Sequence, residues 1–229
     1  MRAAGISARS QRPLASRQSS SGALRSTKRC FCRLKRLPLV SAAPAAVQPS
    51  TEELTAVWEE HLKHEFSTKN TEETIRTMVP HASVNHVPTL TGGKGHEQLR
   101  RFYSESFIPA FPDDTRTTPV NRIVASSAVV DEMVLEFTHD QEMAFMLPGI
   151  APTHKKVSIP LIVVVQFEGE KLALERIYWD QASVLAQIGV LDPSLLPGRA
   201  VSGREQAAKV LDFDSVPSNS AIELAHRQC

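Results

Sequence analysis

The part of the sequence with a globular pattern contains no cysteine. Of the three cysteines in the chain, Cys30 and Cys32 lie in a basic N-terminal segment, and Cys229 is the last residue. A disulfide, a thiolate nucleophile and a cysteine-ligated zinc site all require cysteine within the folded region. We therefore exclude these three types of site from the core.

Long apolar runs are also lacking. The most apolar stretch, residues 159–165, is only as long as a strand and contains Pro160. A membrane-spanning helix requires roughly 20 consecutive apolar residues. The sequence therefore predicts no integral membrane segment.

No acidic residue precedes Glu52, whereas the first 36 residues contain eight Arg and two Lys. A segment rich in Arg, Ser and Ala and free of acids is typical of an organellar transit peptide. We interpret residues 1–50 as such a disordered presequence, with the chloroplast as the predicted compartment and the mitochondrion as the alternative. A basic arm that binds an anionic partner is the other interpretation of this segment.

The remaining residues carry an excess of negative charge. They contain 16 basic and 25 acidic side chains. Binding of nucleic acid requires clustered Lys and Arg, because the phosphate backbone supplies most of the affinity. The composition therefore argues against a nucleic-acid partner.

The pattern after residue 50 predicts an α+β fold. Ser50 or Thr51 followed by Glu predicts a capped amphipathic helix with Trp58 facing the core, and two further helices are expected before residue 112. His61 and His64 on the first helix are interpreted as part of a solvated face, with a metal pair as the alternative. Residues 92–95 (GGKG) are predicted to form a turn, because they lack the spacing of a phosphate-binding loop.

Short connections between the later strands predict an antiparallel meander of four strands. Three helices followed by such a meander form an architecture in which the helices cover one face of a curved antiparallel sheet. We expect one domain over residues 51–190, followed by an extension over residues 191–229 with a short helix and a mobile tail.

Two histidines are candidates for the interior. Alternation over residues 133–146 places His139 on the same strand face as Met133, Leu135 and Phe137, which are apolar. A lone histidine on such a face is usually a hydrogen-bonded core residue, so this alternative stays open. His86 shares a strand face with Val84 and is interpreted as pointing either inward or to the strand surface.

Asp180 lies where the last strand meets a short helix. It is a favoured N-cap residue, and this role alone would explain it. Alternation also places it on one face with Leu172, Leu174 and Tyr178, where burial would raise its pKa toward the range useful for proton transfer. A metal triad of His86, His139 and Asp180 lacks a closely spaced ligand pair, so no metal site is predicted.

The motif WDQASVLAQIG, residues 179–189, resembles the C-terminal signature of the SnoaL-like polyketide cyclases. Asp180 stands at the position of the acid/base aspartate of that family. The order of elements is similar to the cone-shaped superfamily of nuclear transport factor 2, scytalone dehydratase and ketosteroid isomerase. The motifs FTHDQE, residues 137–142, and LPGIAPT, residues 147–153, depart from the cyclases and resemble a separate SnoaL-like subgroup.

The resemblance implies a deep conical pocket, commonly a homodimer, and proton-transfer chemistry on a small apolar carbonyl compound without a metal or organic cofactor. Asp180 is then the predicted acid/base and His139 the residue that orients it or polarises the carbonyl. The other predicted contacts of the substrate are His86, Tyr103, Phe137, Tyr178 and Trp179. Such a protein is a lyase or isomerase of the cyclase, isomerase or dehydratase type.

A non-catalytic ligand-binding or dimerisation module of the same fold is the alternative, with Asp180 as a cap and His139 as a core residue. Similar domains also accompany proteins that resemble dienelactone hydrolases. This sequence has no Gly-x-Ser-x-Gly motif and no core cysteine, so we do not expect it to perform that hydrolysis alone.

Overall fold

The computed structural model describes residues 48–196 and 200–227. The predicted presequence therefore lies outside the described residues, apart from its last three positions. The backbone forms a six-stranded sheet with the order β2-β1-β6-β5-β4-β3. The strands are β1 (Met78–His86), β2 (Thr91–Lys94), β3 (Arg116–Ala125), β4 (Ala128–Thr138), β5 (Lys156–Glu168) and β6 (Lys171–Trp179).

The helices before β3 are short, and side chains cap the first two α-helices. They are α1 (Thr51–Leu62), the π-helical turn η1 (Lys63–Ser67), α2 (Thr71–Arg76), α3 (Gly95–Phe102), the π-helical turn η2 (Tyr103–Phe107) and the 3-10 turn η3 (Ile108–Ala110). Ser50 begins α1 with the predicted capping box, in which its side chain and that of Glu53 each bond the backbone of the other. Satisfying these amide groups stabilises the start of the helix.

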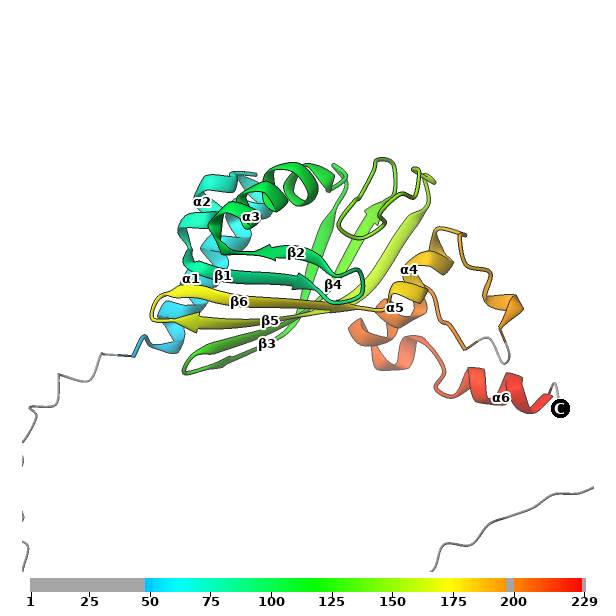
Figure 1. Ribbon diagram of the computed structural model, residues 1–229. Helices are drawn as coiled ribbons and strands as arrows, with labels where there is room; N and C mark the ends of the chain where they lie inside the picture. Colours follow the sequence, from blue (N-terminus) through cyan, green and yellow to red (C-terminus); the bar gives the residue numbers. More distant parts are fainter. Residues whose placement is uncertain (1–47, 197–199, 228–229) are drawn as a thin grey trace, which may run out of the picture. The chain divides into compact units, whose positions relative to one another are not determined.

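The predicted meander is present, but the sheet is mixed. Strands β3, β4, β5 and β6 pair antiparallel in sequence order, as expected. β1 pairs antiparallel with β2 and parallel with β6, so the prediction of a wholly antiparallel sheet is wrong. The chain crosses from β2 to the far edge through α3, and the last strand of the meander then lies beside the first strand (Figure 1).

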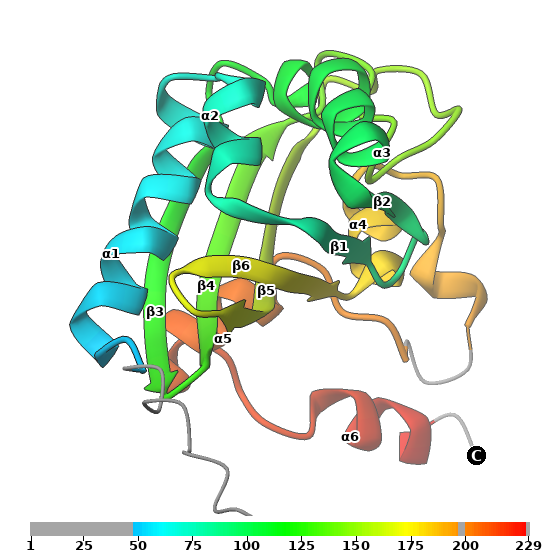
Figure 2. The ribbon, with the colours of Figure 1, turned by 60° about the vertical axis from the view of Figure 1, so that its left-hand side comes forward.

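The helices α1, α2 and α3 lie on one side of the curved sheet (Figure 2). Side chains from both layers form one apolar core, which includes Leu54, Trp58, Leu99, Phe107 and Ile159. The predicted α+β layering, with N-terminal helices packed on a curved sheet, is therefore confirmed. This arrangement encloses the space in which a site can form.

Gly92 lies in a strand, whereas residues 92–95 were predicted to form a turn. β2 pairs with β1 with Gly92 opposite Asn85. A Cβ on Gly92 would lie 2.1 Å from the carbonyl oxygen of Val84, and its φ of +132° is one that other residues rarely adopt. Glycine is therefore required here by the close approach of two backbones.

After β6 the chain forms α4 (Gln181–Gln187), η4 (Pro193–Leu195), α5 (Glu205–Leu211), η6 (Phe213–Ser215) and α6 (Ser220–Arg227). The segment predicted as a tail therefore contains α6. Both α4 and α5 contact β5. Within the two described ranges, no helix combines the length and the apolar character needed to cross a bilayer.

Candidate functional site

A stripe of buried side chains runs along α1 and η1. Leu54, Trp58, His61 and Glu65 are spaced by four, three and four residues, which places them on one helix face. His61 is fully buried and Glu65 is 4% exposed. The interpretation of His61 as part of a solvated face is therefore wrong, because its position follows the apolar stripe.

Glu175 joins this stripe from β6. Its Oε1 lies 3.1 Å from Nε2 of His61, and Oε1 of Glu65 lies 3.1 Å from the same nitrogen. Only the Glu65 contact has hydrogen-bond geometry, and Glu175 Oε1 has no hydrogen-bond partner in the protein. The buried cluster of His61, Glu65 and Glu175 therefore holds one carboxylate oxygen that can still accept a proton.

The protons of His61 can be assigned from its neighbours. Its Nδ1 lies 2.6 Å from the hydroxyl oxygen of Thr77, and that hydroxyl donates to the carbonyl of Thr74 at 2.7 Å. The Thr77 oxygen must therefore accept from Nδ1–H. This bond fixes the ring so that Nε2 faces the two carboxylates.

The cluster shifts the pKa values of its members. Burial lowers the pKa of His61, but the negative charges of Glu175 and Glu65 outweigh it and raise the value to about 10. Burial raises the pKa of Glu65, against the lowering effect of His61. His61 is therefore an imidazolium at neutral pH, and Glu65 holds a proton more readily than an exposed carboxyl.

Trp58 holds the helix that carries His61 against the sheet. Its Nε1–H donates to the buried carboxylate of Asp131 on β4 at 2.8 Å, and Arg122 of β3 donates two further hydrogen bonds to Asp131. The indole stacks on the His61 ring with a centroid separation of 5.6 Å. A cation over an aromatic face is favourable, so this stacking supports the imidazolium.

An inner cavity of about 50 Å³ adjoins the cluster. Glu65, Glu175, Tyr103 and His86 are the polar members of a wall that is otherwise almost wholly apolar. The Tyr103 hydroxyl lies 3.5 Å from His61 Nε2, and burial raises the pKa of this phenol well above its usual value. Tyr103 therefore stays protonated and can donate a hydrogen bond toward the cavity.

A second hollow of about 310 Å³, here called the vestibule, lies beside the inner cavity. The two share four wall residues, Leu62, Phe66, Thr117 and Met133. Phe66 belongs to η1, and π-helical turns often occur at functional sites. These four side chains thus separate the inner cavity from the vestibule.

His86 and Tyr103 are the two predicted site residues that line the inner cavity. His86 ends β1 and is 2% exposed, so its interpretation as an inward-pointing residue agrees with the structure. Trp179 is 9% exposed and its ring lies 5.7 Å from that of His86, next to the cavity wall. Phe137 is buried in the core away from the inner cavity.

Asp180 does not face the cavity, and the expectation that it would is wrong. Its side chain is exposed, as is Tyr178 at 41%. The pairing of β5 with β6 shifts register between Gln166 and Phe167, so the inward residues after Leu172 are Glu175, Ile177 and Trp179. An irregularity of one residue moves every later side chain to the opposite face.

Asp180 instead joins two helices. Its Oδ1 accepts from the amide of Ser183 at the start of α4, and its Oδ2 accepts from the Gln206 side chain of α5 at 2.7 Å. The cap alternative is therefore the one that the geometry supports. The same carboxylate also attaches the C-terminal extension to the domain.

Replacing Asp180 with alanine should lower the free energy of unfolding by about 1 kcal/mol, the usual effect of losing a cap. Asp180→Asn should lower it less, because asparagine keeps one acceptor for the Ser183 amide. Urea unfolding of the three proteins measures this difference. A cap role is ruled out if the alanine variant is as stable as the parent.

His139 is fully buried but lies beyond the end of β4, so the predicted strand through residue 146 is wrong. Its backbone bonds Lys155, Thr153 and His154, and its Nδ1 lies 3.1 Å from the Thr153 hydroxyl. Burial lowers its pKa. His139 thus closes the loop of residues 139–155 and has no contact with Asp180 that would orient it.

The cluster of His61, Glu65 and Glu175 is also the one group in the described residues whose ligand atoms, all within 4.8 Å of one another, could hold a metal ion. A histidine and two carboxylates suit several divalent cations. The imidazolium of His61 already supplies a positive charge between the carboxylates. The positive charge between the two carboxylates can therefore come from the proton on His61 or from a metal ion.

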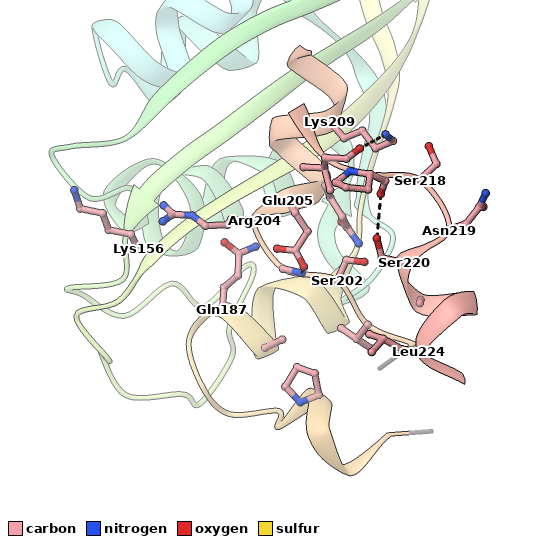
Figure 3. Close-up of a pocket in the computed structure, with 18 residues that line it drawn as sticks. Lys156, Gln187, Ser202, Arg204, Glu205, Lys209, Ser218, Asn219, Ser220 and Leu224 are labelled. Carbon is pink, nitrogen blue, oxygen red and sulfur yellow. Dashed lines mark hydrogen bonds between the residues drawn. The ribbon is translucent and has the colours of Figure 1, made fainter. Parts of the chain in front are cut away.

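A larger hollow of about 820 Å³ lies on the C-terminal extension. Figure 3 shows that polar side chains of Lys156, Arg204, Glu205 and Ser202 surround it. None of its wall residues belongs to the buried cluster or to the inner cavity. It therefore offers charged surface rather than an enclosed site.

Comparison with solved structures finds partial matches to proteins of low sequence identity. TsrD from Streptomyces laurentii is 16% identical, with a TM-score of 0.48, and the match covers 62% of this chain and 99% of TsrD. A nuclear transport factor 2-like protein of unknown function from Burkholderia pseudomallei is 14% identical over 60% of this chain and 98% of its own, with a TM-score of 0.47. A protein with a ketosteroid isomerase-like fold from Catenulispora acidiphila is 17% identical over 61% and 95%, with a TM-score of 0.46.

No curated protein sequence matches this chain. The family model of the SnoaL-like polyketide cyclases matches residues 58–188, which begin at Trp58 on α1 and end just after α4. This range includes the whole buried cluster and every strand of the sheet. The chain therefore belongs to the SnoaL-like polyketide cyclase family.

Proposed function

We propose that the protein is an enzyme that moves a proton next to the carbonyl group of a small, mostly apolar compound, with His61, Glu65 and Glu175 as the reactive groups. The observation that carries this proposal is the placement of a buried imidazolium between two buried carboxyls at the wall of an enclosed apolar cavity. Groups with strongly shifted pKa values in a cavity are typical of sites of proton transfer.

Each member of the cluster has a distinct role in this proposal. Glu175 Oε1 has no hydrogen-bond partner in the protein and accepts the proton from the carbon next to the carbonyl. The electron pair of that C–H bond moves to the carbonyl oxygen. The negative charge on this oxygen is stabilised by the Tyr103 hydroxyl and by the positive charge of His61.

The proton balance of the reaction needs no further reactant. When Glu175 returns its proton to a different carbon of the conjugated system, the product is an isomer of the substrate. When a hydroxyl group leaves from the neighbouring carbon with a proton supplied by Glu65, the products are an unsaturated carbonyl compound and water. Both outcomes use acid/base groups that the cavity wall contains.

The small volume of the inner cavity argues against any bound molecule of ordinary size, and therefore favours the alternative of a dimerisation module. Sites for small molecules usually measure about 300–1,000 Å³. The inner cavity alone measures about 50 Å³, whereas the vestibule measures about 310 Å³. The proposed chemistry therefore requires the side chain of Phe66 to move, so that the inner cavity and the vestibule become one cavity.

Incubation with small cyclic ketones in D₂O tests the proposal. We expect the protein to speed the exchange of deuterium into the carbons next to the carbonyl, measured by NMR, and Asp180→Asn to exchange as fast as the parent. If saturated and conjugated ketones exchange deuterium at the same rate with the protein as in buffer alone, the proton-transfer proposal is refuted and the non-catalytic module remains. Loss of exchange in the Asp180 variant would restore that residue as the acid/base.

A further inference from the structure

His86 is a polar side chain inside an aromatic cage. Its ring centroid lies 5.3 Å from those of Phe107 and Phe145, 5.5 Å from that of Phe102 and 5.7 Å from that of Trp179. The residue is 2% exposed and lines the inner cavity. The proton-transfer roles described above make no use of it.

One nitrogen of His86 has no hydrogen-bond partner. Burial lowers the pKa of the ring to about 4, so it is neutral at physiological pH, and a bond to the Thr91 backbone acts in the opposite direction. A neutral imidazole carries a proton on one ring nitrogen and a lone pair on the other. With the proton on Nε2, the unpartnered Nδ1 presents a bare lone pair.

A second unpartnered acceptor belongs to the same wall. In the parallel pairing of β1 with β6, Val84 is opposite Glu175 and His86 is opposite Ile177. His86 and Glu175 thus lie on one face of neighbouring strands, about 8 Å apart between Cα atoms from standard strand spacings. Glu175 Oε1 is the other cavity atom without a partner.

A buried acceptor without a donor is unfavourable, because it has lost its hydrogen bonds to water. An apolar side chain at position 86 would complete the aromatic core without this cost. A histidine is explained if the occupant of the cavity brings its own donor. Neutral hydroxyl and amide groups meet this requirement without the cost of removing a charge from water.

We propose that His86 determines specificity, with Nδ1 accepting a hydrogen bond from a hydroxyl group of the bound molecule. The cavity then selects hydroxyl-bearing carbonyl compounds over apolar molecules of the same shape. This rests on the proposed function for the carbonyl, which lies toward Tyr103 and His61, while the hydroxyl lies toward His86. The selection itself is a property of binding and does not require turnover.

Phenol and toluene are suitable probes, because they differ mainly in a hydroxyl group. Their dissociation constants are measured by calorimetry for the parent protein and for Phe66→Ala, which opens the wall between the inner cavity and the vestibule. The quantity of interest is the ratio of the toluene constant to the phenol constant. Comparing this ratio between the parent and a variant cancels the different hydration of the two probes.

We expect His86→Phe to reduce this ratio about fivefold, as the loss of one ordinary hydrogen bond predicts. His86→Asn, which keeps an acceptor near the position of Nδ1, should retain most of the ratio. His139→Phe is the matched control, because His139 is also buried with an unpartnered nitrogen but lies outside the cavity wall. It should leave the ratio unchanged.

Thermal unfolding separates a structural role from the proposed one. His86→Phe should unfold at the same or a higher temperature than the parent, because it removes a buried unpartnered acceptor. An unchanged ratio in His86→Phe, or no binding of phenol to either the parent or Phe66→Ala, overturns the proposal.

The two proposals fail separately. A reduced ratio in His86→Phe, together with no deuterium exchange by the parent, supports the hydroxyl contact and refutes the proton transfer. Deuterium exchange by the parent, together with an unchanged ratio in His86→Phe, supports the proton transfer and refutes the hydroxyl contact.

Discussion

Replacing Glu175 with glutamine should reduce deuterium exchange into a responsive ketone by about 10²- to 10⁴-fold, the usual contribution of a positioned general base. Glutamine has nearly the shape of glutamate but cannot accept the proton. Glu175 is 4% exposed, lines the inner cavity, and its Oε1 has no hydrogen-bond partner. Exchange rates measured by NMR give this ratio directly.

The fold should survive this change. The cluster contains two carboxyls and one imidazolium, and removing one buried carboxylate lowers the excess of negative charge. Glu168→Gln is the matched control, because Glu168 ends β5 and pairs only with the exposed His81. If Glu175→Gln and Glu168→Gln exchange deuterium at the same rate, Glu175 is not the base of the proposed mechanism.

Stability should fall steeply as the pH rises above neutrality. The pKa of His61 is about 10 in the folded protein and 6.5 when unperturbed, because the carboxylates of Glu175 and Glu65 outweigh the effect of burial. A raised folded pKa contributes stability that is complete below pH 6.5 and is lost as the pH approaches 10. The contribution is on the order of 3 to 5 kcal/mol.

Of the ionisable groups next to His61, one adds to the loss of stability with rising pH and another stays protonated. Glu65, from η1, has a raised pKa, so its contribution is also lost with rising pH. The Tyr103 hydroxyl, from η2, has a pKa raised well above its usual value and remains protonated through pH 10. Glu175, from β6, completes the set of ionisable groups facing His61.

Urea unfolding from pH 6 to pH 10 measures this loss. His61→Gln should be less stable than the parent at pH 6 and should lack most of the decline, because it has no proton to release. His64→Gln is the control, since His64 lies on the same turn but is partly exposed. A parent whose unfolding free energy stays constant between pH 6.5 and pH 10 would show that His61 is neutral in the folded state.

The sequence predicted the parts of this protein that local interactions decide. The capping box at Ser50, the apolar spacing that turns Trp58 inward and the short turns between β3, β4, β5 and β6 each act over a few residues. Alternation in β1 left both an inward and a surface position open for His86, and the structure has the inward one. These patterns were enough for the α+β fold.

The sequence alone allows only part of the buried cluster to be predicted. The spacing of Leu54, Trp58, His61 and Glu65 is that of a single helix face, so the stripe alone could have placed His61 inside. That placement was missed because polar residues were assigned to solvent. A buried histidine needs a partner, and its carboxylate partner on β6 becomes its neighbour only when the sheet closes around the helix.

Tertiary structure alone decided which acid faces the cavity. Alternation counted along the last strand pointed to Asp180, but the register shift beside Phe167 reverses the faces and brings Glu175 inward instead. Ala173 of β6 is the extra residue, because Gln166 pairs with Leu174 and Phe167 with Leu172. Such a bulge is defined by pairing with the neighbouring strand. The residues therefore determined the elements, whereas the pairing of distant strands determined the site.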